Sequence, residues 1–290
     1  MNRFLEGEIG NKKLPPIGAY WQHSLLPIEQ ALEPVKANID GLDRSIKEAK
    51  RHCCHPSPHQ LTKDESAAIY LYTMEGGDNS FYRILNEALR SENRRALRSW
   101  FGFLKLFDTA LSKLPAVKTS VWRGISGNIS QQFKRGELLT WWSISSCSVE
   151  VDVVQDFLGK NINATLLMIV TKSAKDVSRY TSFPDEKEVI LGPGTQLRVK
   201  GNALQHGTLQ IVHLVEVSDD DGDDQESLPA AVGSMTLNSQ SKNTEPKQVS
   251  SASAVPVMKK PASLNTNKKN IPVSSNRKHY VCQHSSCDNR

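Results

Sequence analysis

The spacing of the apolar residues changes once along this chain, near Leu114 and Pro115. Before that point apolar residues recur every three or four positions, which is the period of one helix face. After it they come in short β-branched or aromatic runs, separated by turns rich in Gly, Asn and Pro. Helices first and strands afterwards predict an α+β fold with mainly antiparallel strands, because a doubly wound parallel sheet needs the two to alternate.

The first part of the chain predicts several helices. An apolar stripe over residues 27–50 is interrupted by Pro34, so this stretch predicts one kinked helix or two. Thr62 and Glu65 have the spacing of a capping box, which predicts that the next helix begins there. Residues 97–111 again place apolar side chains at helical intervals. The sequence therefore predicts a helical lobe before the strands.

The part that follows predicts strands around one further helix. Apolar residues between Val151 and Leu158 share one face of that helix, and Gly159 is its expected C-cap. The strand-like runs are Val121 and residues 138–142, 165–170, 189–191, 196–199 and 209–217.

The last part of the chain has a composition that opposes folding. From Ser218 it begins with an acidic run and continues as a Ser, Asn, Lys, Pro and Thr tract, almost without aromatic residues. Such a segment buries too little apolar surface to offset the entropy lost on ordering. We therefore expect residues 218–290 to be a disordered tail.

Charge and hydropathy exclude some classes of function. The formal net charge of +5 is small for 290 residues and comes partly from the tail, so it does not indicate a nucleic-acid partner. No run of about 18 apolar residues occurs, and residues 1–13 lack the apolar stretch of a signal peptide. We expect no membrane span and a cytoplasmic location, with a nuclear location as the alternative that the tail lysines leave open.

The five cysteines do not form a disulfide pattern, since their number is odd and the chain is long. Cys53-Cys54-His55 and the group Cys282, His284 and Cys287 hint at metal ligands. Neither has the paired C-x-x-C spacing of a structural zinc site. We therefore expect free thiols and no metal.

Three short segments carry groups suited to chemistry. Arg123-Gly124 ends one strand-like run, Ser146 lies in a serine cluster, and Glu186 and Glu188 stand two residues apart. Side chains at i and i+2 of a strand point the same way, so the two glutamates would present paired carboxylates to one cleft. No glycine-rich dinucleotide or P-loop motif is present, so a Rossmann crevice is not expected.

In this order the three segments resemble the Arg, Ser and Glu-x-Glu signature of the arginine-specific mono-ADP-ribosyltransferases of vertebrate ectoenzyme and bacterial toxin type. The resemblance spans residues 60–217, which it implies are the catalytic domain, with residues 1–59 as a helical extension. It implies two packed sheets with a cleft for NAD as co-substrate, no metal, and a protein acceptor with an exposed arginine.

The resemblance also implies roles for the single residues. Glu188 would bind the nicotinamide ribose and stabilise the positive charge that develops on it. Glu186 would orient the acceptor guanidinium and help to remove its proton. Arg123 and Gly124 would hold NAD, and the Ser146 hydroxyl would position nicotinamide and the catalytic glutamate.

Two positions depart from the family pattern, and one turn is a candidate for acceptor contact. Ile144 stands where Phe is usual and Cys147 where Thr is usual, so we expect altered packing or rate rather than a lost site. Tyr180 and Phe183 lie in the turn that leads to Glu186, which contacts the acceptor in the family.

Two other functions remain open at this point. An NAD glycohydrolase would use the same cleft and pass the ribosyl cation to water, although Glu186 argues against it. A non-catalytic binding module of the same fold would lack the chemistry, although all charged residues of the signature are present.

Overall fold

The computed structural model describes residues 3–5, 14–159, 163–201, 204–206 and 209–217. These residues belong to one compact unit. The predicted tail, residues 218–290, and its metal-ligand candidates Cys282, His284 and Cys287 lie outside the described residues.

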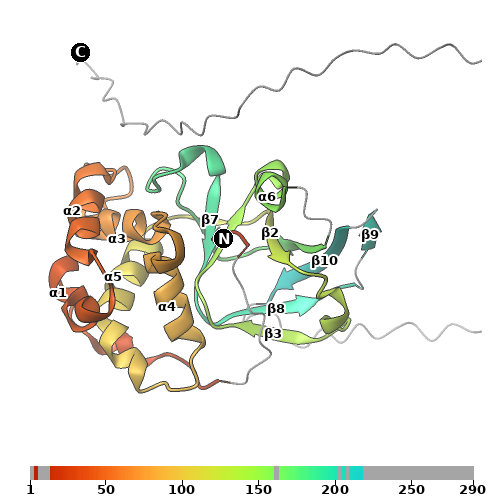
Figure 1. Ribbon diagram of the computed structural model, residues 1–290, viewed down its shortest axis with the longest axis horizontal. Helices are drawn as coiled ribbons and strands as arrows, with labels where there is room; N and C mark the ends of the chain where they lie inside the picture. Colours follow the sequence, from red (N-terminus) through yellow and green to blue (C-terminus); the bar gives the residue numbers. More distant parts are fainter. Residues whose placement is uncertain (1–2, 6–13, 160–162, 202–203, 207–208, 218–290) are drawn as a thin grey trace, which may run out of the picture. The chain divides into compact units, whose positions relative to one another are not determined.

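A group of helices forms one side of the molecule (Figure 1). Pro34 interrupts the first apolar stripe as predicted, giving two α-helices with a 3₁₀ turn between them. The Thr62 and Glu65 capping box is confirmed, with each side chain bonded to the other's backbone N–H. The helical elements are η1 (Ala19–Gln22), α1 (Ile28–Leu32), η2 (Glu33–Asn38), α2 (Leu42–His52), α3 (Lys63–Thr73), η3 (Gly77–Asn79), α4 (Phe81–Arg90), η4 (Ala96–Trp100) and α5 (Phe101–Ser112).

A curled sheet forms the other side. Its strands follow the order β1-β6-β7-β4-β2-β5-β10-β8-β3, and β9 pairs with β10. Pairing is antiparallel except between β5 and β10, as the mainly antiparallel prediction requires. The strands are β1 (Ala116–Val117), β2 (Ser120–Ser126), β3 (Leu138–Trp141), β4 (Ser145–Ser148), β5 (Ala164–Val170), β6 (Ala174–Asp176), β7 (Glu188–Leu191), β8 (Thr195–Val199), β9 (Leu204–His206) and β10 (Leu209–Glu216), with η5 (Ser130–Gln132), α6 (Val151–Leu158) and η6 (Pro184–Glu186) between them.

The predicted pair of packed sheets is one continuous ladder of hydrogen bonds that curls on itself. Leu139 of β3 and Leu191 of β7, near opposite ends of the strand order, belong to the same buried cluster. The two halves of the sheet therefore enclose a common core. Helix α6 lies against β2, where Val154 and Leu158 form a separate small cluster with Leu166.

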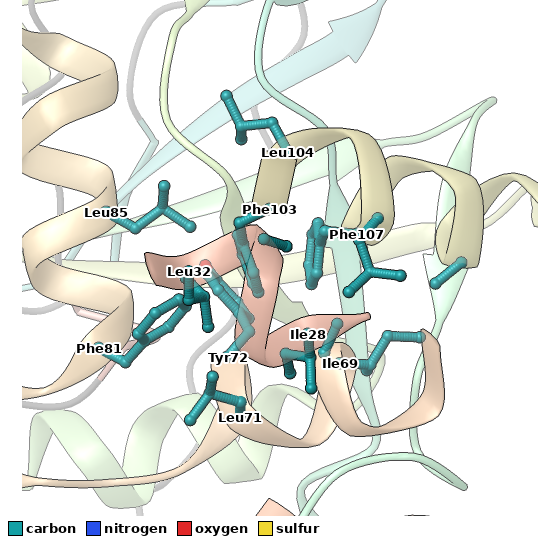
Figure 2. Close-up of a cluster of buried hydrophobic side chains, with 14 of the residues drawn as sticks. Ile28, Leu32, Ile69, Leu71, Tyr72, Phe81, Leu85, Phe103, Leu104 and Phe107 are labelled. Carbon is teal, nitrogen blue, oxygen red and sulfur yellow. The ribbon is translucent and has the colours of Figure 1, made fainter. Parts of the chain in front are cut away.

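The predicted boundary at residue 59 has no counterpart in the packing. Helices from both sides of it share one core, which Figure 2 shows around Ile28, Tyr72 and Phe107. Ile144 and Ile190 from the sheet join the same cluster. Helices and sheet are therefore packed as one body. No helix in the described part of the chain is long and apolar enough to cross a membrane.

Candidate active site

Strands β2 and β4 lie side by side and place Arg123 next to Ser146. The two strands are antiparallel and the register pairs Trp122 with Ser148, so Arg123, one residue further along β2, lies level with the middle of β4. Arg123 is buried, and its Nη1 donates to the carbonyl oxygens of Ser146 at 2.5 Å and Arg3 at 3.0 Å. The guanidinium thus braces two strands and a segment from the start of the chain.

Successive side chains of β4 point to opposite faces of the sheet, so the thiol of Cys147 lies on one face and the hydroxyls of Ser146 and Ser148 lie on the other. Cys147 points into the apolar core of the sheet, and burial raises the pKa of its thiol to about 12. That environment makes Cys147 a packing residue and a poor nucleophile. Ser146 and Ser148 lie on the opposite face. Ser148 Oγ donates to the carbonyl oxygen of Glu186 at 2.7 Å and so fixes the turn that carries this glutamate.

The two glutamates do not share a strand, and the prediction that strand alternation brings them together is wrong. Glu186 ends the 3₁₀ turn η6, whereas Glu188 is the first residue of β7. Lys187 between them is left-handed, with a φ of 47°, which is a costly conformation for a residue other than glycine. Pro184 starts the turn, and its ring favours such a bend over an extended strand.

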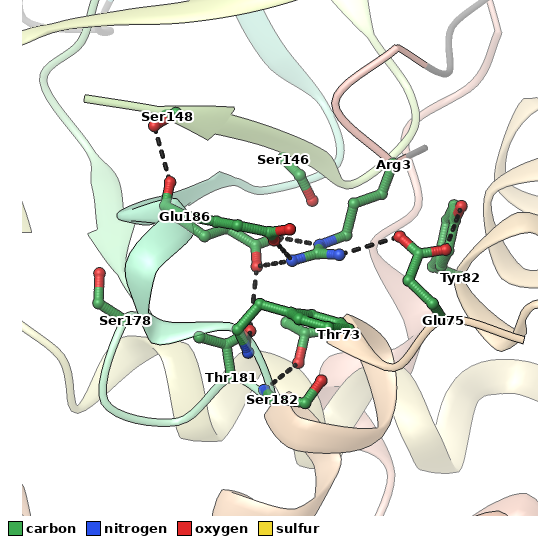
Figure 3. A network of polar contacts seen from close by, with 12 residues as sticks. Arg3, Thr73, Glu75, Tyr82, Ser146, Ser148, Ser178, Thr181, Ser182 and Glu186 are labelled. Carbon is green, nitrogen blue, oxygen red and sulfur yellow. Dashed lines mark hydrogen bonds and ion pairs between the residues drawn. The ribbon is translucent and has the colours of Figure 1, made fainter. Parts of the chain in front are cut away.

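Despite this, both carboxylates meet at one guanidinium group, that of Arg3. Arg3 Nε and Nη2 donate to the two carboxylate oxygens of Glu188, each at 3.0 Å. Nη2 also donates to Glu186 Oε2, and Nη1 donates to Glu75 Oε1 at 3.0 Å. Figure 3 shows Arg3 reaching between Glu186 and Glu75. The Arg3 side chain is 1% exposed and Glu188 is 0% exposed.

The charges of this cluster are unbalanced, because one cation faces three carboxylates. Burial raises the pKa of Glu186 to about 7, with Arg3 opposing the rise and Glu188 adding to it. Burial alone would lower the pKa of Arg3, but Glu188 and Glu186 outweigh it and raise the pKa, so the guanidinium stays charged. A carboxyl group that titrates near neutral pH is suited to accept a proton.

Gly124 is positioned for contact through its backbone. Its N–H donates to the Phe4 carbonyl oxygen at 3.1 Å. A Cβ atom on residue 124 would lie 2.6 Å from Leu5 Cδ2, so a side chain there would collide with the segment that now covers it. The absence of a side chain lets another chain or a ligand approach the strand closely.

The two aromatic candidates for acceptor contact lie in different surroundings. The ring of Phe183 is half-buried, with its centroid 5.2 Å from the Arg3 guanidinium carbon, so it lies beside the two glutamates' shared partner. Tyr180 is 1% exposed and packs with the helices, and its hydroxyl bonds to Ser57 and His59. In this conformation the Tyr180 ring is buried, whereas the Phe183 ring is partly exposed.

Several residues that support the site were missed at the level of sequence. Asn86 of α4 bonds to both backbone groups of Ile144, at 3.0 Å each, and Tyr72 also donates to that carbonyl at 3.1 Å. These bonds hold the start of β4. Thr181 Oγ1 lies 3.5 Å from Glu188 Oε2. The contacts of Asn86 and Tyr72 with Ile144 join parts of the chain 58 and 72 residues apart, so no local sequence pattern marks them.

One buried hydroxyl fits a ligand of the site. Ser146 Oγ lies beside the Tyr72 hydroxyl, yet within the described residues it has no hydrogen bond of ordinary geometry. A buried polar group without a partner costs roughly 1–3 kcal/mol, so an incoming polar ligand would relieve it. Over the described residues no group of three or more His, Cys, Asp or Glu residues is arranged to hold a metal ion.

The chain matches the family described as ART: NAD:arginine ADP-ribosyltransferase over residues 28–220. The match begins at α1, so it includes helices that the sequence assigned to a separate extension.

Relatives of known name agree with this match. Mav of Mycobacterium avium strain 104, named for an expected NAD(+)–arginine ADP-ribosyltransferase activity, is 29% identical over 190 residues, 63% of this chain and 22% of Mav. The erythroblast NAD(P)(+)–arginine ADP-ribosyltransferase of Gallus gallus is 28% identical over 52% of this chain and 51% of that protein. The chain thus spans at most about half the length of these relatives.

Two solved structures match the chain in part. Vis toxin, an ADP-ribosyltransferase from Vibrio splendidus, is 15% identical, with a TM-score of 0.47 over 71% of this chain and 93% of that chain. Exoenzyme S from Pseudomonas aeruginosa is 19% identical, with a TM-score of 0.47 over 76% of this chain and 100% of that chain.

Proposed function

The chain belongs to the NAD:arginine ADP-ribosyltransferase family, and we propose that it transfers ADP-ribose from NAD to arginine side chains of a protein acceptor. The observation that carries the proposal is that Glu186 and Glu188 both accept hydrogen bonds from one guanidinium group, that of Arg3. A pair of carboxylates that binds a guanidinium in a buried site has the chemistry needed to select an arginine acceptor.

The bond broken is the one between the nicotinamide nitrogen and C1 of the ribose, and its electron pair leaves with nicotinamide. The ribose then carries positive charge in a transition state of oxocarbenium character, as in glycoside hydrolysis. Glu188 starts β7 and has Thr181 Oγ1 3.5 Å from its Oε2, so its carboxylate is held in place to stabilise that charge.

The acceptor nitrogen then forms a bond to C1 and must lose a proton. A free guanidinium has a pKa above about 12, so it is a poor nucleophile while protonated. Glu186 has a pKa raised to about 7 by burial, and its carboxylate is placed to orient the guanidinium and to take this proton. Both tasks need Glu186 ionised, which predicts faster transfer above neutral pH.

The residues around the glutamates fit the nicotinamide end of NAD. The Gly124 N–H is a backbone donor for a carboxamide, and the unsatisfied Ser146 hydroxyl lies in the same buried region. Arg123 would brace the cleft, since its bond to the Ser146 carbonyl fixes β2 against β4. Phe183 would face the acceptor side, where its ring now covers a guanidinium.

The proposal is tested by incubating the full chain with NAD and agmatine, a small guanidinium compound. Transferase activity predicts ADP-ribosyl-agmatine in amounts close to the nicotinamide released. Nicotinamide release with only free ADP-ribose would instead identify an NAD glycohydrolase. If titration detects NAD binding but no nicotinamide is released, the protein is a binding module. Labelled NAD and a lysate, followed by mapping of the modified residues, would then identify the protein acceptor.

A further inference from the structure

The cleft is already filled by a segment of the same chain, residues 3–5. Phe4 is fully buried, and its ring stacks on Phe157 of α6 with centroids 5.3 Å apart and planes 11° apart. Leu5 packs with Val154 and Leu158 of the same helix. Arg3 is held by the glutamates, so each of the three side chains is buried and has its own partners.

The backbone of this segment bonds to the Gly124 N–H, which the proposed function assigns to NAD, and to Arg123, which braces the same region. The Phe4 carbonyl accepts from the Gly124 N–H at 3.1 Å, and the Arg3 carbonyl accepts from Arg123 Nη1 at 3.0 Å. Both oxygens of Glu188 are bonded to Arg3 and its side chain is 0% exposed, so a ribose cannot reach this carboxylate while Arg3 stays in place. The segment and the nicotinamide end of NAD therefore require the same groups.

We propose that Arg3-Phe4-Leu5 is an inhibitory segment that occupies the catalytic cleft in place of NAD. Arg3 presents a guanidinium to the glutamates as an acceptor would, but the backbone beside it blocks the donors for nicotinamide. NAD then binds only when the segment withdraws. The inference rests on the proposed function, because the competition is defined by the residues that hold NAD.

The loss of NAD affinity caused by the segment depends on the fraction of molecules in which the segment has left the cleft. The apparent dissociation constant of NAD equals its intrinsic value divided by the open fraction. A segment with three buried side chains and a guanidinium bound by three carboxylates should keep that fraction at or below about one in ten. Weakening the segment should therefore tighten NAD binding about tenfold or more.

The test measures binding of a carbocyclic NAD analogue, which is not cleaved, to full-length variants by titration calorimetry. Arg3→Ala removes the guanidinium, and Phe4→Ala keeps the guanidinium but removes the stack on Phe157. Arg44→Ala removes one positive charge from an exposed position on α2 and serves as the control. The proposal predicts at least about tenfold tighter binding for the first two variants and no change for Arg44→Ala.

Other outcomes overturn the proposal in distinguishable ways. If the wild type and all three variants bind the analogue equally, residues 3–5 do not inhibit NAD binding, and the proposed function is unaffected. Weaker binding by Arg3→Ala would make Arg3 a ligand of NAD instead of its competitor. If no variant binds the analogue, the proposed function itself fails, and the competition fails with it.

A second measurement needs no substitution. Phenylglyoxal modifies accessible guanidinium groups, and mass spectrometry of the wild-type chain compares Arg3 with Arg44. The segment predicts that Arg3 reacts at least about tenfold more slowly than Arg44, and that the NAD analogue accelerates the reaction of Arg3, because two competing ligands displace each other reciprocally. An Arg3 that reacts as fast as Arg44 without the analogue would overturn the proposal.

Discussion

Within the candidate site, the Arg3 guanidinium is shared by the carboxylates of Glu75, Glu186 and Glu188. The positive charge cannot neutralise all three, and Glu186 responds with a pKa raised to about 7 by burial. An ordinary glutamate in the unfolded chain titrates near pH 4.3. The folded protein therefore holds a proton on Glu186 over a range of pH in which the unfolded chain has lost it.

This difference gives a prediction for stability against pH. Because the pKa of Glu186 is raised in the folded state, its contribution is fully present below about pH 4.3 and is lost as the pH rises through about 7. Glu186→Gln removes the carboxylate, so the variant should be more stable than the wild type at pH 8, by on the order of 1–3 kcal/mol, and nearly equal at pH 4.5.

Denaturant unfolding at the two pH values checks it. Asp185→Asn, at the exposed neighbouring position, serves as the control and should not change the pH dependence. A Glu186→Gln variant that loses as much stability as the wild type between pH 4.5 and 8 would contradict the raised pKa.

At the scale of elements, strands β2, β4 and β7 and the turn η6 bring the residues of the Arg, Ser and Glu-x-Glu signature together. β2, β4 and β7 are neighbours in the sheet, so Arg123, Ser146 and Glu188 lie close although the chain separates them. Helix α4 supports this arrangement from outside the sheet, because Asn86 bonds to both backbone groups of Ile144, next to β4.

Asn86→Ala should therefore weaken both stability and catalysis. The substitution leaves the buried Ile144 N–H without the acceptor that it has in the structure, at a cost of about 1–3 kcal/mol. It also frees the start of β4, so nicotinamide release should fall even at a temperature where the variant stays folded. Glu87→Ala, at an exposed position of the same helix, is the matched control. An Asn86→Ala protein with normal stability and rate would show that α4 does not support the site.

The sequence allowed the fold class, the kinked first helices and the capping box to be predicted, because each depends on spacing within a few residues. The strand-like segments around Arg123, Ser146 and Glu188 are strands in the structure, but their order in the sheet had no signal in the sequence. It placed Glu186 wrongly, because alternation assumes an extended strand and Pro184 starts a turn instead. Arg3 had no signal at all, since it lies 185 residues from Glu188 and no local pattern marks such a contact.

At the scale of the whole molecule, the helices and the sheet form one packed body. Ile144 and Ile190 of the sheet region and Tyr180 before η6 lie in the helical core. The helices before residue 60 join the same core, and the family match also begins among them. The helices are thus part of the body that carries the site.

The buried clusters of the described chain draw on residues up to Leu214. A shortened chain that ends at Val217 should therefore keep its thermal unfolding temperature within about 2 °C and its nicotinamide release within about twofold of the full chain, because it retains every residue of these clusters. Thermal unfolding and the release assay check this. A collapse of either value would show that residues 218–290 contribute to the fold or to the site.

The most direct test of the proposed mechanism separates the two glutamates by measuring nicotinamide release and transfer to agmatine in parallel, at saturating NAD. Glu188→Gln removes the charge that faces the oxocarbenium ion, so both rates should fall by about two to three orders of magnitude. Glu186→Gln should leave nicotinamide release nearly intact and reduce transfer far more, because only the acceptor loses its base. Normal transfer by Glu186→Gln, or full NAD cleavage by Glu188→Gln, would contradict the roles assigned to the pair.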